Sequence, residues 1–216
     1  MSQPITHNAA CPGCGRELEF TLWQSISTET ENAREDIISG KLFDVCCPDC
    51  GYKARVQYPI LFTDLEHNTW IWFYPEDRAE EAMSIIEAAR AQGVRCRLVL
   101  SQEALSEKAA IFSLGLDDRI IELMKLAAAA QINEALPGCE LGPVVFALND
   151  EGKPCFLFKV DGTTNFMDVN MDEYNEFNTI FGALLTADES ALVIDARWVL
   201  GFMGGGEAPE AGESAE

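Results

Sequence analysis

Two short cysteine-containing turns constrain this chain more than any other feature. The first is Cys11-Pro12-Gly13-Cys14-Gly15 and the second is Cys47-Pro48-Asp49-Cys50-Gly51. In each turn a proline restricts φ after the first cysteine, and the final glycine can adopt a left-handed conformation close to a metal. A Cys-X-X-Cys turn directs both thiols to the same side, and two such turns supply four thiolates. We therefore predict a tetrahedral structural Zn²⁺ site with the ligands Cys11, Cys14, Cys47 and Cys50.

A site with four thiolate ligands has no open position for water, so we expect the metal to stabilise the fold without activating a nucleophile. Ligand type does not by itself separate zinc from iron or an iron–sulfur cluster. We favour zinc because paired turns of this kind suit a zinc ribbon. Redox-active disulfides are the remaining alternative for the same four residues.

The other cysteines and the histidines give no comparable signal. Cys46 precedes Cys47 directly, and adjacent strand residues point to opposite faces, so we do not expect Cys46 to be a ligand. The remaining cysteines lack ligand spacing and are expected to pack as small hydrophobic residues: Cys96, Cys139 and Cys155. The two histidines, His7 and His67, have no recognisable triad neighbour, and we expect both to be solvated. We therefore predict no catalytic residue and no residue that binds an organic cofactor.

The charge of the chain limits its partners. Fifteen Lys and Arg residues against 36 Asp and Glu residues give a formal net charge of −21, which opposes binding to nucleic acid. The charge is expected to maintain solubility, and a basic partner is the alternative explanation. The longest apolar segments are far too short to span a bilayer, and no N-terminal basic stretch leads into an apolar run. We expect a cytoplasmic protein that does not contact a membrane.

Alternating polar and apolar residues predict a strand after each cysteine turn, and the segment between them favours a short helix. Farther along, the pattern predicts a hairpin and then a β-α-β-like step. The first strands are predicted over 17–23 and 53–58, and the helix over 31–38. The hairpin is predicted from 59–62 and 69–74, and the helix and strand that follow from 75–93 and 94–100. Further helices are predicted over 101–112 and from Asp117 to Pro137.

The C-terminal part indicates a small α+β unit. A hairpin is predicted from residues 144–148 and 156–160, followed by a helix over 172–185 with Asn170 at its cap and a final buried strand over 191–202. The predicted fold class is α+β, with a zinc-ribbon-like β module elaborated by α/β segments. The predicted domains are a flexible N-terminus (1–10), a zinc-ribbon and α/β domain (11–136), the small α+β unit (137–203) and a disordered acidic tail (204–216).

The cysteine turns and their surroundings resemble the CpXC family, which is named for two Cys-Pro-X-Cys motifs. Besides these motifs, four stretches are similar to that family: residues 22–26, 39–43, 58–64 and 115–119. The resemblance covers residues 11 to about 130. It implies a zinc-binding domain with Cys11, Cys14, Cys47 and Cys50 as ligands, and it implies no activity. Cys46 and the segment after Pro137 lie outside what the resemblance describes.

Together these features predict a structural-zinc protein that serves protein–protein contacts or self-association and is not an enzyme. A nucleic-acid-associated ribbon is the first alternative, with Arg16, Lys41, Lys53 and Arg55 as its candidate contacts. An enzyme is the second alternative, and the cluster 117–119 is its candidate site. A thiol-redox protein is the third. The sequence identifies neither a partner nor a substrate, nor does it fix the oligomeric state.

Overall fold

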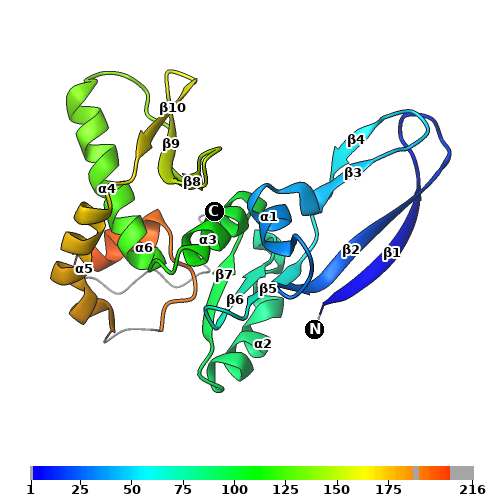
Figure 1. Ribbon diagram of the computed structural model, residues 1–216, viewed down its shortest axis with the longest axis horizontal. Helices are drawn as coiled ribbons and strands as arrows, with labels where there is room; N and C mark the ends of the chain where they lie inside the picture. The colour runs from blue at the N-terminus through cyan, green and yellow to red at the C-terminus, as the bar shows by residue number, and fades with distance from the viewer. Residues whose placement is uncertain (1, 187–189, 205–216) are drawn as a thin grey trace, which may run out of the picture. The chain divides into compact units, whose positions relative to one another are not determined.

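The structure is a computed structural model, and it describes residues 2–186 and 190–204. The chain forms two compact units, Met1–Ser113 and Leu114–Glu216, each of which combines sheets with helices (Figure 1). The predicted α+β class is confirmed. Among the described residues, no helix has both the length and the apolar composition needed to cross a membrane.

The first unit is built on a five-stranded mixed sheet with the order β1-β2-β5-β6-β7. The pairs β1/β2 and β5/β6 are antiparallel, whereas β2/β5 and β6/β7 are parallel. The predicted hairpin and the β-α-β-like step are therefore present. The strands are β1 (Gln3–Ala10), β2 (Glu17–Ser27), β5 (Ile60–Asp64), β6 (Thr69–Phe73) and β7 (Arg95–Val99).

Apolar faces of helices cover the central strands of this sheet. Helix α3 packs against β6 and β7, α2 packs against β7, and α1 packs against α3. The core between them contains the fully buried side chains Phe43, Phe62, Phe73 and Ile37. The helices are α1 (Ala33–Ile38), α2 (Glu80–Arg90) and α3 (Gln102–Ser113), with short 3-10 turns at Lys41–Phe43 and Glu76–Arg78.

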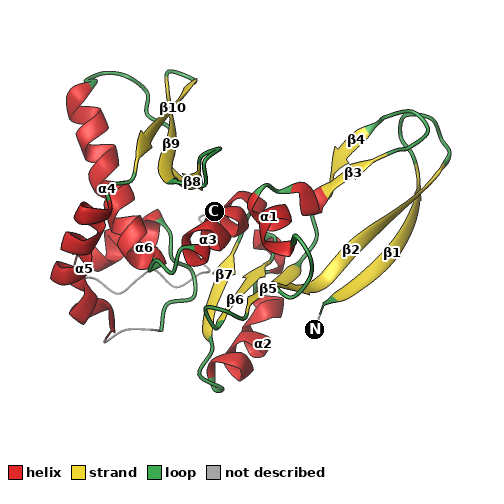
Figure 2. Ribbon diagram, viewed as in Figure 1, coloured by secondary structure: helices red, strands yellow, loops and turns green. Residues whose placement is uncertain are grey.

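A separate two-stranded antiparallel sheet carries the second cysteine turn. It consists of β3 (Asp44–Cys46) and β4 (Lys53–Arg55), three residues each. Figure 2 shows β1–β2 and β3–β4 as two hairpins that extend from the same unit. A two-stranded hairpin of this length is marginal in water without further support.

The second unit places helices α4 (Asp118–Ala135), α5 (Met171–Thr186) and α6 (Ala196–Gly204) together with a three-stranded antiparallel sheet. Its strands are β8 (Val145–Leu148), β9 (Pro154–Val160) and β10 (Thr163–Asp168), in the order β10-β9-β8. Helix α4 packs against α5, α6 and β8. The predicted 144–160 hairpin and the helix capped by Asn170 are present, since the Asn170 side chain accepts a hydrogen bond from the Asp172 amide at 2.9 Å.

Three expectations about the fold differ from the structure. Residues 3–10, predicted to be flexible, form β1 because they pair with β2 along their whole length. The predicted final strand over 191–202 is wrong: the segment ends in α6, whose first turn is capped by Asp195, which accepts hydrogen bonds from the amides of Arg197 and Trp198 at 2.9 and 3.0 Å. Helix α4 belongs to the second compact unit, although we grouped it with the first. The predicted acidic tail after Gly204 lies outside the described residues.

Candidate metal centre

The two cysteine turns have the same backbone hydrogen-bond pattern. In the first turn, the Cys11 amide donates to the Arg16 carbonyl and the Gly15 amide donates to the Cys11 carbonyl, both at 2.8 Å. In the second turn the equivalent bonds join Cys47 to Tyr52 at 2.8 Å and Gly51 to Cys47 at 2.9 Å. Gly15 and Gly51 both have φ of 74°, a left-handed conformation that glycine adopts without a Cβ clash. The equal spacing in the sequence thus produces two matching turns.

The matching turns bring the four predicted ligands together. The ligand atoms of Cys11, Cys14, Cys47 and Cys50 all lie within 4.8 Å of one another. Two pairs across the turns are Cys11 Sγ to Cys50 Sγ at 3.6 Å and Cys14 Sγ to Cys47 Sγ at 3.9 Å. In a tetrahedron with Zn–S bonds of about 2.3 Å, the sulfur atoms lie about 3.8 Å apart. The thiols are therefore spaced as four ligands of one metal ion would be, and all four are free of disulfide bonds.

A small apolar cluster supports the first cysteine of each turn. Cys11 and Cys47 are buried together with Leu18, and Phe20 and Val45 pack against them. The second cysteines, Cys14 and Cys50, are exposed. An ion between the turns would therefore have an apolar side facing the hairpins and an open side facing solvent.

In the metal-free cluster, the pKa values of Cys11, Cys14 and Cys50 are shifted in different directions. Burial raises the pKa of Cys11, but hydrogen bonds from the amides of Gly13 and Cys14 and from neighbouring thiols lower it to about 7. For Cys50, a hydrogen bond from the Tyr52 amide lowers the pKa, whereas burial and the other three thiols raise it to about 12. The pKa of Cys14 is also raised. Of these three thiols, Cys11 therefore ionises first, and a bound cation would favour ionisation of Cys14 and Cys50.

These pKa shifts predict that metal binding releases protons. Cys14 and Cys50 keep their protons at pH 7 in the metal-free protein because their pKa values are raised, whereas a zinc site requires thiolates. We expect roughly two or more protons to be released per zinc ion at pH 7, and affinity to fall as the pH falls. Calorimetric titration in buffers of different ionisation enthalpy measures this number. Binding without proton release would contradict thiolate ligation.

Gly13 leaves room for the facing turn. A Cβ atom at this position would lie 3.1 Å from Tyr52 Cβ and 3.2 Å from Cys50 Sγ. We therefore expect Gly13→Ala to displace Cys50 and to weaken zinc binding about tenfold, as measured by competition with a chromophoric chelator. The matched control is Gly142→Ala, whose Cβ would lie at an ordinary 3.5 Å from Lys159 Cβ in the second unit. Equal zinc affinity of both variants would show that the two turns are not in close register.

The other cysteines lie apart from this cluster. Cys46 is exposed on β3 and its sulfur contacts only the Cys47 carbonyl, at 3.9 Å, among the contacts of the described residues. Cys96 and Cys155 are buried, and Cys139 is partly buried. Among the described residues, the group of neighbouring thiols contains none of these four cysteines.

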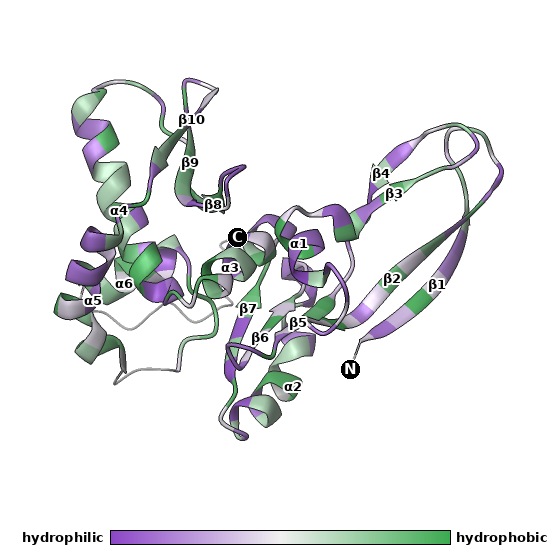
Figure 3. Cartoon of the chain, viewed as in Figure 1, coloured by the Kyte–Doolittle hydropathy of each residue, from purple (hydrophilic) through white to green (hydrophobic). Residues whose placement is uncertain are grey.

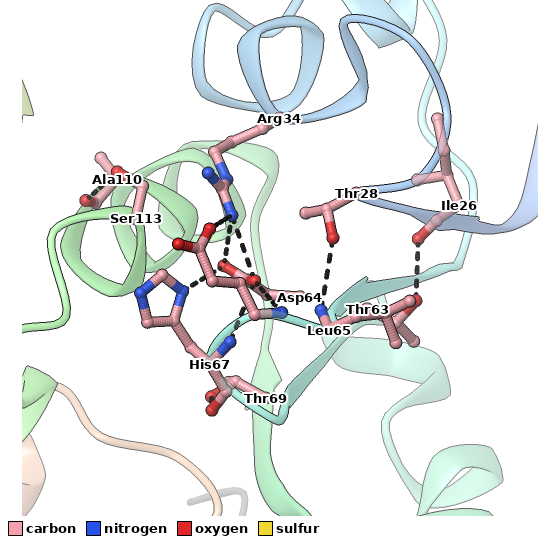
Figure 4. Close-up of polar contacts among 11 residues, drawn as sticks. Ile26, Thr28, Arg34, Thr63, Asp64, Leu65, His67, Thr69, Ala110 and Ser113 are labelled. Atoms are coloured by element: carbon pink, nitrogen blue, oxygen red, sulfur yellow. Dashed lines mark hydrogen bonds and ion pairs between the residues drawn. The ribbon is translucent and has the colours of Figure 1, made fainter.

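A second polar cluster, in the β5–β6 turn, was missed in the sequence (Figure 4). Asp64 is 1% exposed, and its carboxylate accepts hydrogen bonds from the amides of Glu66 and His67 at 3.1 and 3.3 Å. The Arg34 guanidinium contacts both carboxylate oxygens at 3.2 and 3.3 Å and also Glu66 at 3.0 Å. His67 Nδ1 lies 2.9 Å from Asp64 Oδ2, so His67 is not the solvated loop residue that we predicted. His7 is exposed on β1 and stacks on Phe20 with ring centroids 6.0 Å apart.

Asp64, Glu66 and His67 also have ligand atoms within 4.8 Å of one another. Arg34 already occupies the space between the two carboxylates, however, and the Asp64 oxygens accept five hydrogen bonds in total. A cation would have to displace a guanidinium that compensates the same charge. The arrangement is that of a structural cluster which fixes the turn. One sequence signal could have indicated this cluster: an Asp at the end of a strand can accept hydrogen bonds from the backbone amides two and three residues later.

The cluster 117–119, considered above as a possible catalytic site, forms the start of α4. Asp117 is the N-cap residue and accepts a hydrogen bond from the Arg119 amide at 2.9 Å. The Arg119 guanidinium donates to both Asp117 oxygens at 3.0 and 2.7 Å and to the Leu185 carbonyl at 2.7 Å. Burial raises the pKa of Asp117, but the hydrogen bonds from Arg119 outweigh this effect and lower it. Both side chains thus hold α4 and α5 together.

The fold and the cluster define a class: mixed α+β proteins in which two matching turns present a four-cysteine cluster able to bind a metal ion. Residues 9–125 match the model of the CpXC protein family. This match covers more than half of the 216 residues, and the chain belongs to the CpXC family. The resemblance noted from the sequence is confirmed. The match ends within α4, so β8 to β10, α5 and α6 lie outside it. No curated protein and no solved structure matches the chain.

Proposed function

We propose that the four cysteines hold one structural zinc ion, which fastens the β3–β4 hairpin to the β1–β2 hairpin as a zinc ribbon. The observation that carries this proposal is the approach of four thiols from two turns with the same hydrogen bonds. A hairpin of two three-residue strands needs support of this kind to stay ordered. The ligands would be Cys11, Cys14, Cys47 and Cys50. When bound, the ion would supply folding free energy and fixed geometry, not a reactive water.

The role served by this scaffold is protein–protein interaction. The charges near the cysteine turns support this proposal over nucleic-acid binding. Of the four basic residues considered for nucleic acid, Arg16 contacts Asp49 at 2.7 Å and Arg55 contacts Asp44 at 3.0 Å. Their charge is thus compensated within the chain, and the net charge of −21 adds long-range repulsion of phosphate.

Elemental analysis of protein purified without chelator tests the metal proposal. We expect about one zinc ion per chain and no visible absorption, because zinc is a d¹⁰ ion. Stoichiometric iron together with visible absorption would show that the site binds iron instead of zinc. Absence of any metal, with a thiol count that shows disulfides within the turns, would overturn the scaffold and favour thiol-redox chemistry.

A further inference from the structure

The second unit carries exposed apolar side chains on α5 and α6, which we together call the α5–α6 face. Its members are the most exposed large apolar residues of these two helices: Ile180 at 65%, Leu184 at 61%, Leu200 at 62% and Met203 at 55%. Ile180 and Leu184 are four residues apart on α5, and Leu200 and Met203 are three apart on α6, so each pair lies on one side of its helix. Figure 3 shows the hydrophobic stretches of α5 and α6 in green.

Other side chains of both helices are engaged in packing within the second unit. The Phe181 and Phe202 rings join α5 to α6 at 6.3 Å between centroids, and Trp198 stacks on Phe202 at 5.4 Å. Both helices also pack on α4, and Leu185 and Val199 are buried. The aromatic contacts hold the two helices side by side, so the exposed residues cannot be buried by a small rotation of either helix. Exposed apolar side chains that gather on one surface mark interaction sites, whereas singly scattered ones do not.

The sequence in and after α5 and α6 is strongly acidic. Residues 205–216 contain four glutamates and no large apolar residue. Residues 171–216 as a whole contain ten acidic residues and one basic residue, Arg197. Glu173 and Glu176 lie on α5 seven and four residues before Ile180, on the same side of the helix. The apolar face is therefore surrounded in sequence by negative charge.

We propose that the α5–α6 face binds a basic amphipathic helix of a partner protein, with the apolar side chains of that helix on the four exposed residues and its Lys or Arg residues toward the acidic surroundings. Charge complementarity selects this occupant. A second copy of the chain is disfavoured because two copies would bring the same acidic segments together. The proposal is independent of the metal site, because all of these residues follow the family match.

The test uses the full-length protein and a synthetic leucine–lysine peptide of about 14 residues whose leucines share one helix face. We expect micromolar binding by fluorescence anisotropy, at least about tenfold weaker for the double variant Ile180→Gln/Leu200→Gln. Raising the salt from about 50 to 500 mM should also weaken binding. The matched control is Ile85→Gln, which changes an isoleucine of similar exposure, 51%, on α2 in the first unit.

Four results would overturn the proposal. The first is equal binding of the leucine–lysine peptide by the double variant and the wild type, which would mean attraction by charge alone. The second is binding of a leucine–glutamate peptide as tight as that of the leucine–lysine peptide. The third is a loss of peptide binding in the control variant Ile85→Gln that is as large as the loss in the double variant. The fourth is a dimer of the wild type in analytical ultracentrifugation that the double variant disperses, because the face would then be an interface between copies of this chain. Circular dichroism of the variants confirms that each is folded.

Discussion

Replacing Cys47 by serine is expected to remove zinc from the protein and to lower the midpoint of thermal unfolding by about 10 °C or more. A shift of this size corresponds to a loss of roughly 4 kcal/mol in a chain of this length, which is typical of losing a structural metal. Cys47 is buried in the apolar cluster with Cys11 and Leu18. Its loss leaves three thiols for the ion and a polar hydroxyl among apolar side chains. Elemental analysis and a thermal melt of the same preparation measure both effects.

The matched control is Cys46→Ser, one position earlier on β3. Cys46 is an exposed thiol, so this variant should keep its zinc and its unfolding midpoint. If both variants keep the metal, Cys47 is not a ligand and the proposed centre is wrong. If both lose it, the second turn does not tolerate any change, and Cys50→Ser, at an exposed ligand, then separates ligation from packing. A chelator should reproduce the Cys47→Ser phenotype in the wild type and leave that variant unchanged.

Replacing Asp64 by alanine is expected to destabilise the first unit by about 3 kcal/mol or more. The buried carboxylate accepts hydrogen bonds from Arg34, from His67 and from two backbone amides of its own turn. Its removal leaves His67 and the two amides without this acceptor and Arg34 with only the exposed Glu66, and the cost of that is larger than the net value of the ion pair. Urea unfolding followed by tryptophan fluorescence measures the effect, because Trp70 and Trp72 lie on β6, directly after this turn.

Glu66→Gln is the matched control for Asp64→Ala. Glu66 also contacts Arg34, but its side chain is 68% exposed, and an exposed ion pair contributes at most about 0.5 to 1 kcal/mol. A difference of about 2 kcal/mol or more between the two variants is therefore expected. Equal, small effects would show that Asp64 is solvated and that the turn does not depend on it.

Elements with a strong local pattern were predicted correctly from the sequence. The β5–β6 hairpin, the parallel return to β7 and helix α5 follow from alternation, turn residues and helix caps. The errors fall where local pattern is ambiguous. The segment that ends in α6 is apolar on most sides, and a short apolar run fits a buried strand as well as a buried helix. Residues 3–10 have little apolar pattern and become ordered through pairing with β2.

The sequence alone determined the candidate metal centre, because the ligand type, the two-residue spacing and the glycines with positive φ are all local properties of two five-residue turns. The tertiary structure decided everything that depends on distant partners. Arg34 meets Asp64 across 30 positions of the chain, and no local spacing predicts such a pair. The tertiary structure likewise exposes one side of α5 and α6, because helix packing decides which of two apolar sides is buried.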